Sequence, residues 1–136
     1  MASASNYLED TLLKHVMRNA GTNGANYDTA SLAFYVSLHT GSPGEANDGS
    51  NEISGSGYAR QSATFGNVSS GSVSTNATIS FPAASSDYSA NVTHIGIYDA
   101  STSGNLLWHG ALSSPKDVNQ NDVFQINSGS LTITLA

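Results

Sequence analysis

The feature that most constrains the fold is a series of short segments in which apolar residues alternate with other residues, separated by stretches rich in Gly, Asn, Ser and Asp. A period of two places successive side chains on opposite faces of a strand, so this pattern is typical of β-strands with one face on the core. In the first such segment we expect one buried face, made of Leu32, Phe34, Val36 and Leu38, opposite Ala33, Tyr35, Ser37 and His39.

Short strands joined by turns, without helices alternating between them, are typical of antiparallel sheets. The 136 residues are enough for one such core and too few for two ordinary ones. We therefore predict a mainly β fold, an antiparallel β-sandwich or a jelly-roll-like barrel, as a single domain over residues 1–136. The strand candidates are residues 32–39, 58–65, 78–81, 92–98, 106–112, 123–127 and 131–135.

One α-helix is expected near the N-terminus, over residues 6–20, because apolar residues recur there at helical spacing. Asn6 followed by Glu9 is similar to a capping box, and Gly21 stands where a helix stop is expected. The apolar residues of this helix are Leu8, Leu12, Leu13 and Val16.

The charge content excludes several classes of partner. The chain has a net charge of -6 and only four Lys and Arg residues, so no basic stripe could neutralise phosphates, and we expect no nucleic acid partner. No apolar run reaches the roughly 20 residues that span a bilayer, and residues 1–5 lack the pattern of a secretory signal. We therefore expect no membrane partner and no export through a signal peptide.

The residues that carry enzyme chemistry occur without the spacing that such chemistry needs. The chain has no Cys, and His39, His94 and His109 lie in separate predicted strands, so we interpret the imidazoles as half-buried groups bonded to backbone or hydroxyls. No Gly-x-Ser-x-Gly motif and no phosphate-binding Gly-rich loop is present. We assign no catalytic residue, no metal ligand and no cofactor, and we expect the protein not to be an enzyme.

Residues 41–57 read as a long loop, and loops of this length often bind something. Glycoside cleavage needs two carboxyl groups at a fixed distance, and we expect this loop to be too mobile to hold its carboxylates in that way. The oxygen-rich stretch 47–52 does not have the spacing of the helix-loop-helix calcium motif, so we interpret it as a solvated loop and leave calcium binding open.

Aromatic side chains offer a second binding hypothesis. Trp108, Tyr58, Tyr88 and Tyr98 could form a platform on which sugars stack, which would make the protein a carbohydrate-binding module. The interpretation that we favour is that these side chains fill the core or a contact between subunits.

Arg60 is the residue that we expect to act as a structural anchor. It is a rare cation inside a strand-like segment, and we expect it to pair with a carboxylate such as Asp99 or to bond to carbonyl groups. A direct contact of Arg60 with a partner is the alternative. The candidate anchor or interface residues are Tyr58, Arg60, His94, Asp99 and Trp108.

Two segments, residues 52–65 and 93–107, resemble a family of small virion structural proteins of tailed bacteriophages, often labelled tail fibre proteins. They contain Glu-Ile-Ser-Gly-Ser-Gly-Tyr-Ala-Arg and Thr-His-Ile-Gly-Ile-Tyr-Asp-Ala, followed by Gly-Asn-Leu-Leu. With residues 6–10, 35–38 and 110–112, the resemblance covers nearly the whole chain.

The resemblance implies a part of the virion, assembled in the host cytoplasm. Small β-sandwich proteins of this size in phage heads act as decoration or cement proteins, and a fibre shaft needs repeats that this chain lacks. We therefore expect a decoration protein that binds the major capsid protein and stabilises the head, with a tail fibre or tail adaptor as the alternative. We also expect a homo-oligomer, by hypothesis a trimer.

Overall fold

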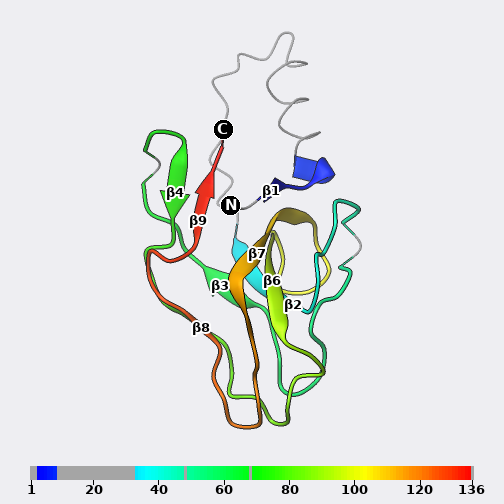
Figure 1. Ribbon diagram of the computed structural model, residues 1–136. Coiled ribbons are helices and arrows are strands. Elements are labelled where there is room, and N and C mark those ends of the chain that lie inside the picture. Colours follow the sequence, from blue (N-terminus) through cyan, green and yellow to red (C-terminus); the bar gives the residue numbers. More distant parts are fainter. Residues whose placement is uncertain (1–2, 9–32, 48, 68, 136) are drawn as a thin grey trace.

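A computed structural model describes residues 3–8, 33–47, 49–67 and 69–135, and its described regular structure is almost entirely β-strand (Figure 1). Residues 6–8 form a helical turn, whereas the rest of the predicted helix 6–20 lies outside the described residues. The strands are β1 (Ser3–Ala4), β2 (Phe34–His39), β3 (Gln61–Ala63), β4 (Ser72–Ser74), β5 (Ile79–Ser80), β6 (Val92–Tyr98), β7 (Leu106–Lys116), β8 (Gln125–Ile126) and β9 (Thr132–Thr134).

The strands form one five-stranded sheet, in the order β1-β7-β6-β2-β3, and two ribbons, β4-β9 and β5-β8. Every pairing is antiparallel. The prediction of a mainly β, antiparallel fold with one N-terminal helix is therefore confirmed, and the described part of that helix is short. The described strands do not close into a barrel, so a sandwich-like arrangement describes them better than the jelly-roll-like barrel. No helix among the described residues is long and apolar enough to cross a membrane.

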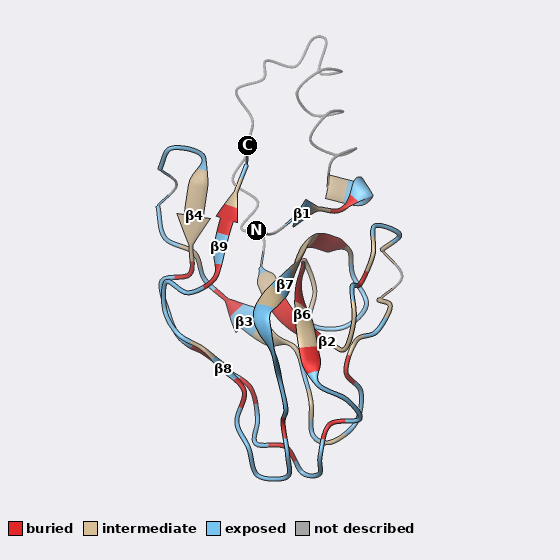
Figure 2. Cartoon of the chain, in the orientation of Figure 1, coloured by how far each residue is buried: buried red, intermediate tan, exposed pale blue. Residues whose placement is uncertain are grey.

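The core lies between one face of the five-stranded sheet and the two ribbons. The β2–β6 register places Val36 beside Ile97 and Leu38 beside Ile95, which gives this face paired apolar side chains. The ribbons and their flanking loops contribute Ile133 of β9 and an edge-to-face pair of aromatic rings, Phe81 and Phe124. Figure 2 shows buried positions along the inner strands and at points along the loops.

The opposite face of the sheet is also buried, which corrects the expectation of a single buried face for β2. Ser37 and His39 are both 0% exposed. The reason is that the segment after β2 returns beside this strand, where an isolated bridge joins His39 to Glu52. From there it reaches over the face: the Ser50 carbonyl lies 2.9 Å from His39 Nδ1, and the Arg60 guanidinium lies over the Tyr98 ring. Polar residues at alternate positions of β2 therefore face a second, polar interior.

The N-terminal strand is attached to the sheet by Ser5. Its N–H donates to the Leu107 carbonyl, at 2.9 Å, and its hydroxyl donates to the Leu106 carbonyl. The same hydroxyl accepts from the N–H of Leu8, at 3.4 Å, so Ser5 caps the helical turn, one residue before the Asn6 that the sequence pattern indicates.

We predict that Gly96→Ala destabilises the protein, because a Cβ there would lie 2.7 Å from Ser37 Oγ and 3.0 Å from Leu106 Cδ1. Overpacking of this kind costs about 1–3 kcal/mol. The matched control is Gly66→Ala, where the nearest atom would be 3.7 Å away. Thermal unfolding should separate the two variants, and equal melting temperatures would contradict the close packing at Gly96.

Candidate functional site

The candidate site is a buried polar cluster on the second face of the sheet, which we name the Arg60 cluster: Arg60, Glu52, Tyr58, His39 and Tyr98. At its centre the Arg60 Nε donates to Glu52 Oε1 and the Arg60 Nη2 donates to Glu52 Oε2, both at 2.7 Å. This bidentate geometry matches the planar guanidinium to the planar carboxylate. The side chains are 8% and 17% exposed, so the pair is largely removed from water.

The remaining donor group of Arg60 binds the hairpin loop that joins β6 to β7. Nη1 donates to the carbonyls of Ala100, at 3.1 Å, and Ser103, at 2.7 Å. The guanidinium also lies over the ring of Tyr98, with Cζ 3.5 Å from the ring centroid, which is a cation–π contact. Arg60 thus joins the segment that contains Glu52, which is near it in the sequence, to the β6–β7 hairpin, which lies about forty residues further along the chain.

Tyr58 extends the cluster to the sheet. Its hydroxyl donates to Glu52 Oε1, at 2.8 Å, and accepts from the backbone N–H of Leu38, at 3.1 Å. The ring stacks on Phe81 and meets Tyr88 edge to face, so Tyr58 lies between the polar cluster and the apolar core.

The pKa values follow from burial and from these contacts. Burial raises the pKa of Glu52, but hydrogen bonds from Arg60 and Tyr58 outweigh that effect, and the pKa of the carboxyl lies below its usual value. Burial lowers the pKa of Arg60, yet the bonds and charge of Glu52 raise it overall. Burial also raises the pKa of Tyr58 well above its usual value. Glu52 and Arg60 therefore stay charged while Tyr58 stays neutral.

His39 ties the covering loop to the sheet. Its Nδ1 lies 2.9 Å from the Ser50 carbonyl, which only accepts, so Nδ1 carries the proton and Nε2 accepts from the Ser37 hydroxyl, at 2.8 Å. The ring stacks on Tyr98, with 9° between the planes. Burial lowers the pKa of His39 below 6.5, so the neutral ring is the folded form.

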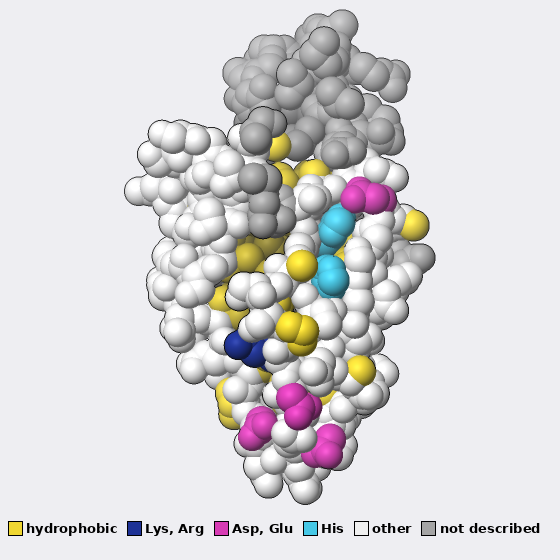
Figure 3. Space-filling model, in the orientation of Figure 1, with side chains coloured by type: hydrophobic (Ala, Val, Ile, Leu, Met, Phe, Trp, Pro, Cys, Tyr) yellow, Lys and Arg dark blue, Asp and Glu magenta, His cyan; other side chains and the backbone are white. Residues whose placement is uncertain are grey.

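The other strand histidines lie on the same face of the sheet. His94 is opposite His39 in the β2–β6 register, and its Nδ1 lies 2.8 Å from the Thr93 hydroxyl. His109 Nε2 lies 2.9 Å from Glu45 Oε1, and Figure 3 shows histidine and acidic side chains side by side on this surface. Within the described part of the chain, no three His, Cys, Asp or Glu residues are grouped so that they could hold a metal ion.

The remaining residues singled out from the sequence have separate places. Asp99 accepts from the backbone N–H and the side-chain amide of Asn105, at 2.6 and 2.9 Å, and so closes the hairpin loop. The carboxylate that pairs with Arg60 is Glu52, eight residues earlier, together with the carbonyl bonds that we expected for Arg60. Trp108 is half-buried on β7, opposite Ile97, and packs against the core.

Comparison with known proteins gives one family. Residues 3–134 match the family model described as Podophage GP4 fiber I protein gp80. No curated protein matches the chain. The match extends over nearly the whole chain, as does the resemblance that was first seen in residues 52–65 and 93–107.

We predict that Arg60→Ala lowers the free energy of unfolding by about 3–5 kcal/mol, because Glu52 would be left as a buried, unpaired charge. Lys116→Ala is the control, since Lys116 is an exposed cation and its loss should change stability by about 0.5 kcal/mol or less. Urea denaturation measures both. Replacing the pair together, as Glu52→Gln with Arg60→Met, should recover part of the loss; equal stability of Arg60→Ala and Lys116→Ala would contradict the anchoring role.

The buried His39 predicts a specific pH dependence of stability. A lowered pKa in the folded state means that the unfolded chain binds the proton more readily, so stability is complete above about pH 6.5 and falls as the pH drops below that value. Glu52, whose pKa is lowered, adds a loss only below about pH 4.5. Melting temperatures between these values should fall with pH in the parent and in His109→Gln, but less steeply in His39→Gln. The same slope in all three proteins would refute this prediction.

Proposed function

Because this chain belongs to the Podophage GP4 fiber I protein gp80 family, we propose that it is a non-enzymatic component of a fibre on a tailed-phage virion. The observation that carries the proposal is the family match, which extends over residues 3–134 of the 136. The chain is a structural protein of a bacteriophage particle, and the proposal concerns its position in the particle and its mode of action.

The geometry of the Arg60 cluster supports a mechanical role. Its charged and polar groups are directed at one another and at backbone carbonyls, and Arg60 itself is 8% exposed. A catalytic group needs access to substrate and a protonation state near its switching point. The pKa values of Glu52, Arg60 and Tyr58 are instead shifted so that each group keeps one protonation state. We therefore infer that the cluster stabilises the shape that the protein presents to its partners.

The surface supports packing against other subunits. Only 10% of the residues are charged, so neighbouring copies meet with little repulsion between like charges. We propose that the protein binds other virion subunits, assembles in the host cytoplasm and acts as a homo-oligomer, by hypothesis a trimer. Several modest interfaces in one assembly then add through multivalency.

Decoration of the head is the second candidate, and a specific observation favours it. A fibre shaft gains length from repeats or heptads, whereas this sequence has neither and its described strands fold into one small sandwich-like unit. In that role the protein would bind the major capsid protein and tie neighbouring capsomers together.

Copy number in purified virions separates the two positions. We expect the fibre component to be present at a small multiple of the portal protein, as measured by quantitative mass spectrometry with labelled peptide standards. A copy number close to that of the major capsid protein would overturn the fibre position in favour of decoration. Virions without the protein would overturn both.

A further inference from the structure

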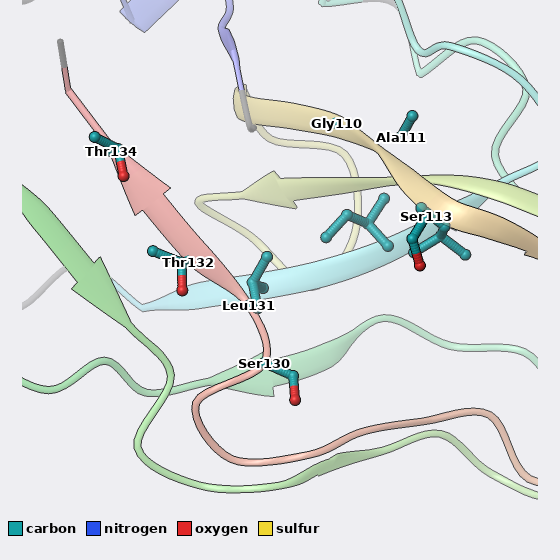
Figure 4. Close-up of a pocket in the computed structure, with 9 residues that line it drawn as sticks. Gly110, Ala111, Ser113, Ser130, Leu131, Thr132 and Thr134 are labelled. Atoms are coloured by element: carbon teal, nitrogen blue, oxygen red, sulfur yellow. The ribbon is translucent and has the colours of Figure 1, made fainter.

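A groove of about 460 Å³ lies between β7 and β9 (Figure 4). Gly110, Ala111 and Ser113 flank it on β7, and the segment from Ser130 to Thr134 flanks it on the other side. In the space-filling view, hydrophobic side chains line a hollow between the lobe that carries β4 and β9 and the strands β6 and β7 (Figure 3). Apolar residues of the core reach this groove, namely Ile95, Leu112 and Leu131.

Among the described strands, β9 is paired on one side only, and its other edge lies on the side of the groove. β9 pairs with β4 on one side, where the Leu131 carbonyl accepts from Thr75 N–H and the Leu135 N–H donates to the Gly71 carbonyl. Backbone groups alternate in direction along an antiparallel strand. The N–H and C=O groups of Thr132 and Thr134 therefore face away from β4, towards the groove.

On the β7 side, the described strands cover only part of the edge. β1 pairs with this edge of β7 for two residues, Ser3 with His109 and Ala4 with Trp108, and the Ser5 N–H donates to the Leu107 carbonyl. Residues 107 and 109 thus direct their backbone groups towards β1. By the same alternation Ala111 directs its N–H and C=O to that side, beyond the last residue that β1 covers in the described chain.

We propose that an extended, uncharged segment of a neighbouring virion subunit inserts into this groove and pairs with both β7 and β9. Two strand edges that no described strand pairs at these positions face one groove, and an extended chain is the occupant that satisfies backbone donors and acceptors on both flanks. The added strand would join the five-stranded sheet to the β4-β9 ribbon. This inference rests on the proposed function, which supplies neighbouring subunits.

The lining of the groove defines the side chains of that segment. None of the nine residues that line it is ionisable; they are hydroxyl-bearing, small or apolar. A charged side chain would lose its hydration there without gaining a partner of opposite charge. The inserted strand should therefore place an apolar side chain above Ile95 and Leu131 and small or hydroxyl-bearing side chains at the rim.

Hydrogen–deuterium exchange tests the insertion directly, comparing the isolated protein with purified virions. Peptides that contain Ala111, Thr132 and Thr134 should exchange fast in the isolated protein and become protected in virions. Peptides from the exposed loop around Thr102 serve as the internal control and should exchange alike in both. Protection elsewhere on the protein, with unchanged exchange at these three amides, would overturn the insertion and leave the proposed function standing.

Two further outcomes of this experiment are decisive. Absence of the protein from virions would overturn the proposed function and the insertion with it. Protection of the same amides in the isolated protein, rising with concentration, would identify a second copy of this chain as the occupant and overturn the assignment to another subunit.

A pair of variants provides an independent test. Ser113→Arg places a long cation in the uncharged groove, and Thr102→Arg places the same side chain on an exposed loop away from it. Both variants should keep the parent melting temperature. Thr102→Arg should be incorporated into virions at the parent level, whereas Ser113→Arg should be incorporated at less than about a tenth of it, because each 1.4 kcal/mol of lost binding is tenfold. Equal incorporation would contradict the proposal.

Discussion

The hydrogen-bonded ion pair between Glu52 and Arg60 is the interaction on which the second, polar interior of the protein depends. A small β protein can cover one face of a sheet with apolar ribbons, but the other face must meet either water or a second layer. Here the second layer is a loop, and a loop brings polar backbone that needs partners. The Ser50 carbonyl and the Ile53 N–H of that loop meet this need on β2, and Arg60 ties the loop to the β6–β7 hairpin because one guanidinium binds Glu52 and two hairpin carbonyls at once.

The two faces of the sheet are consequently held by different physics. On one side apolar side chains from β2 and β6 pack against the ribbons, and burial of apolar area is non-directional. On the other side His39, Tyr58 and Arg60 form directional hydrogen bonds that are buried beneath the loop. The low dielectric there strengthens each hydrogen bond and makes an unsatisfied polar group costly. The first face supplies most of the driving force for folding, whereas the second specifies where the loop lies.

The sequence predicts the first face well and the second poorly. Alternation identified β2 and β6, and residues 92–98 were predicted with the bounds that β6 has. The same alternation places Ser37 and His39 on the polar side of a strand. Their burial could not be predicted from it, because they are buried by the segment after β2, which folds back onto the strand. β4 escaped notice because Ser72-Val73-Ser74 has one apolar residue, and two-residue strands such as β1 have no period at all. Glu52 was interpreted as a loop carboxylate, since the turn that brings it to Arg60 has no recognisable sequence pattern.

The family assignment depended on whole segments and was confirmed, whereas the position in the particle depends on contacts with other subunits, which the sequence of one chain does not show.

The attachment of Ser5 to β7 has a consequence for how the chain is made. Its partner, Leu106, is 101 residues further along the sequence. During synthesis β1 cannot pair with β7 until the intervening residues have been made, so β1 is added to the sheet only after β7 exists. Closing so long a loop is entropically slow, and β7 must therefore keep that part of its edge available until β1 pairs with it.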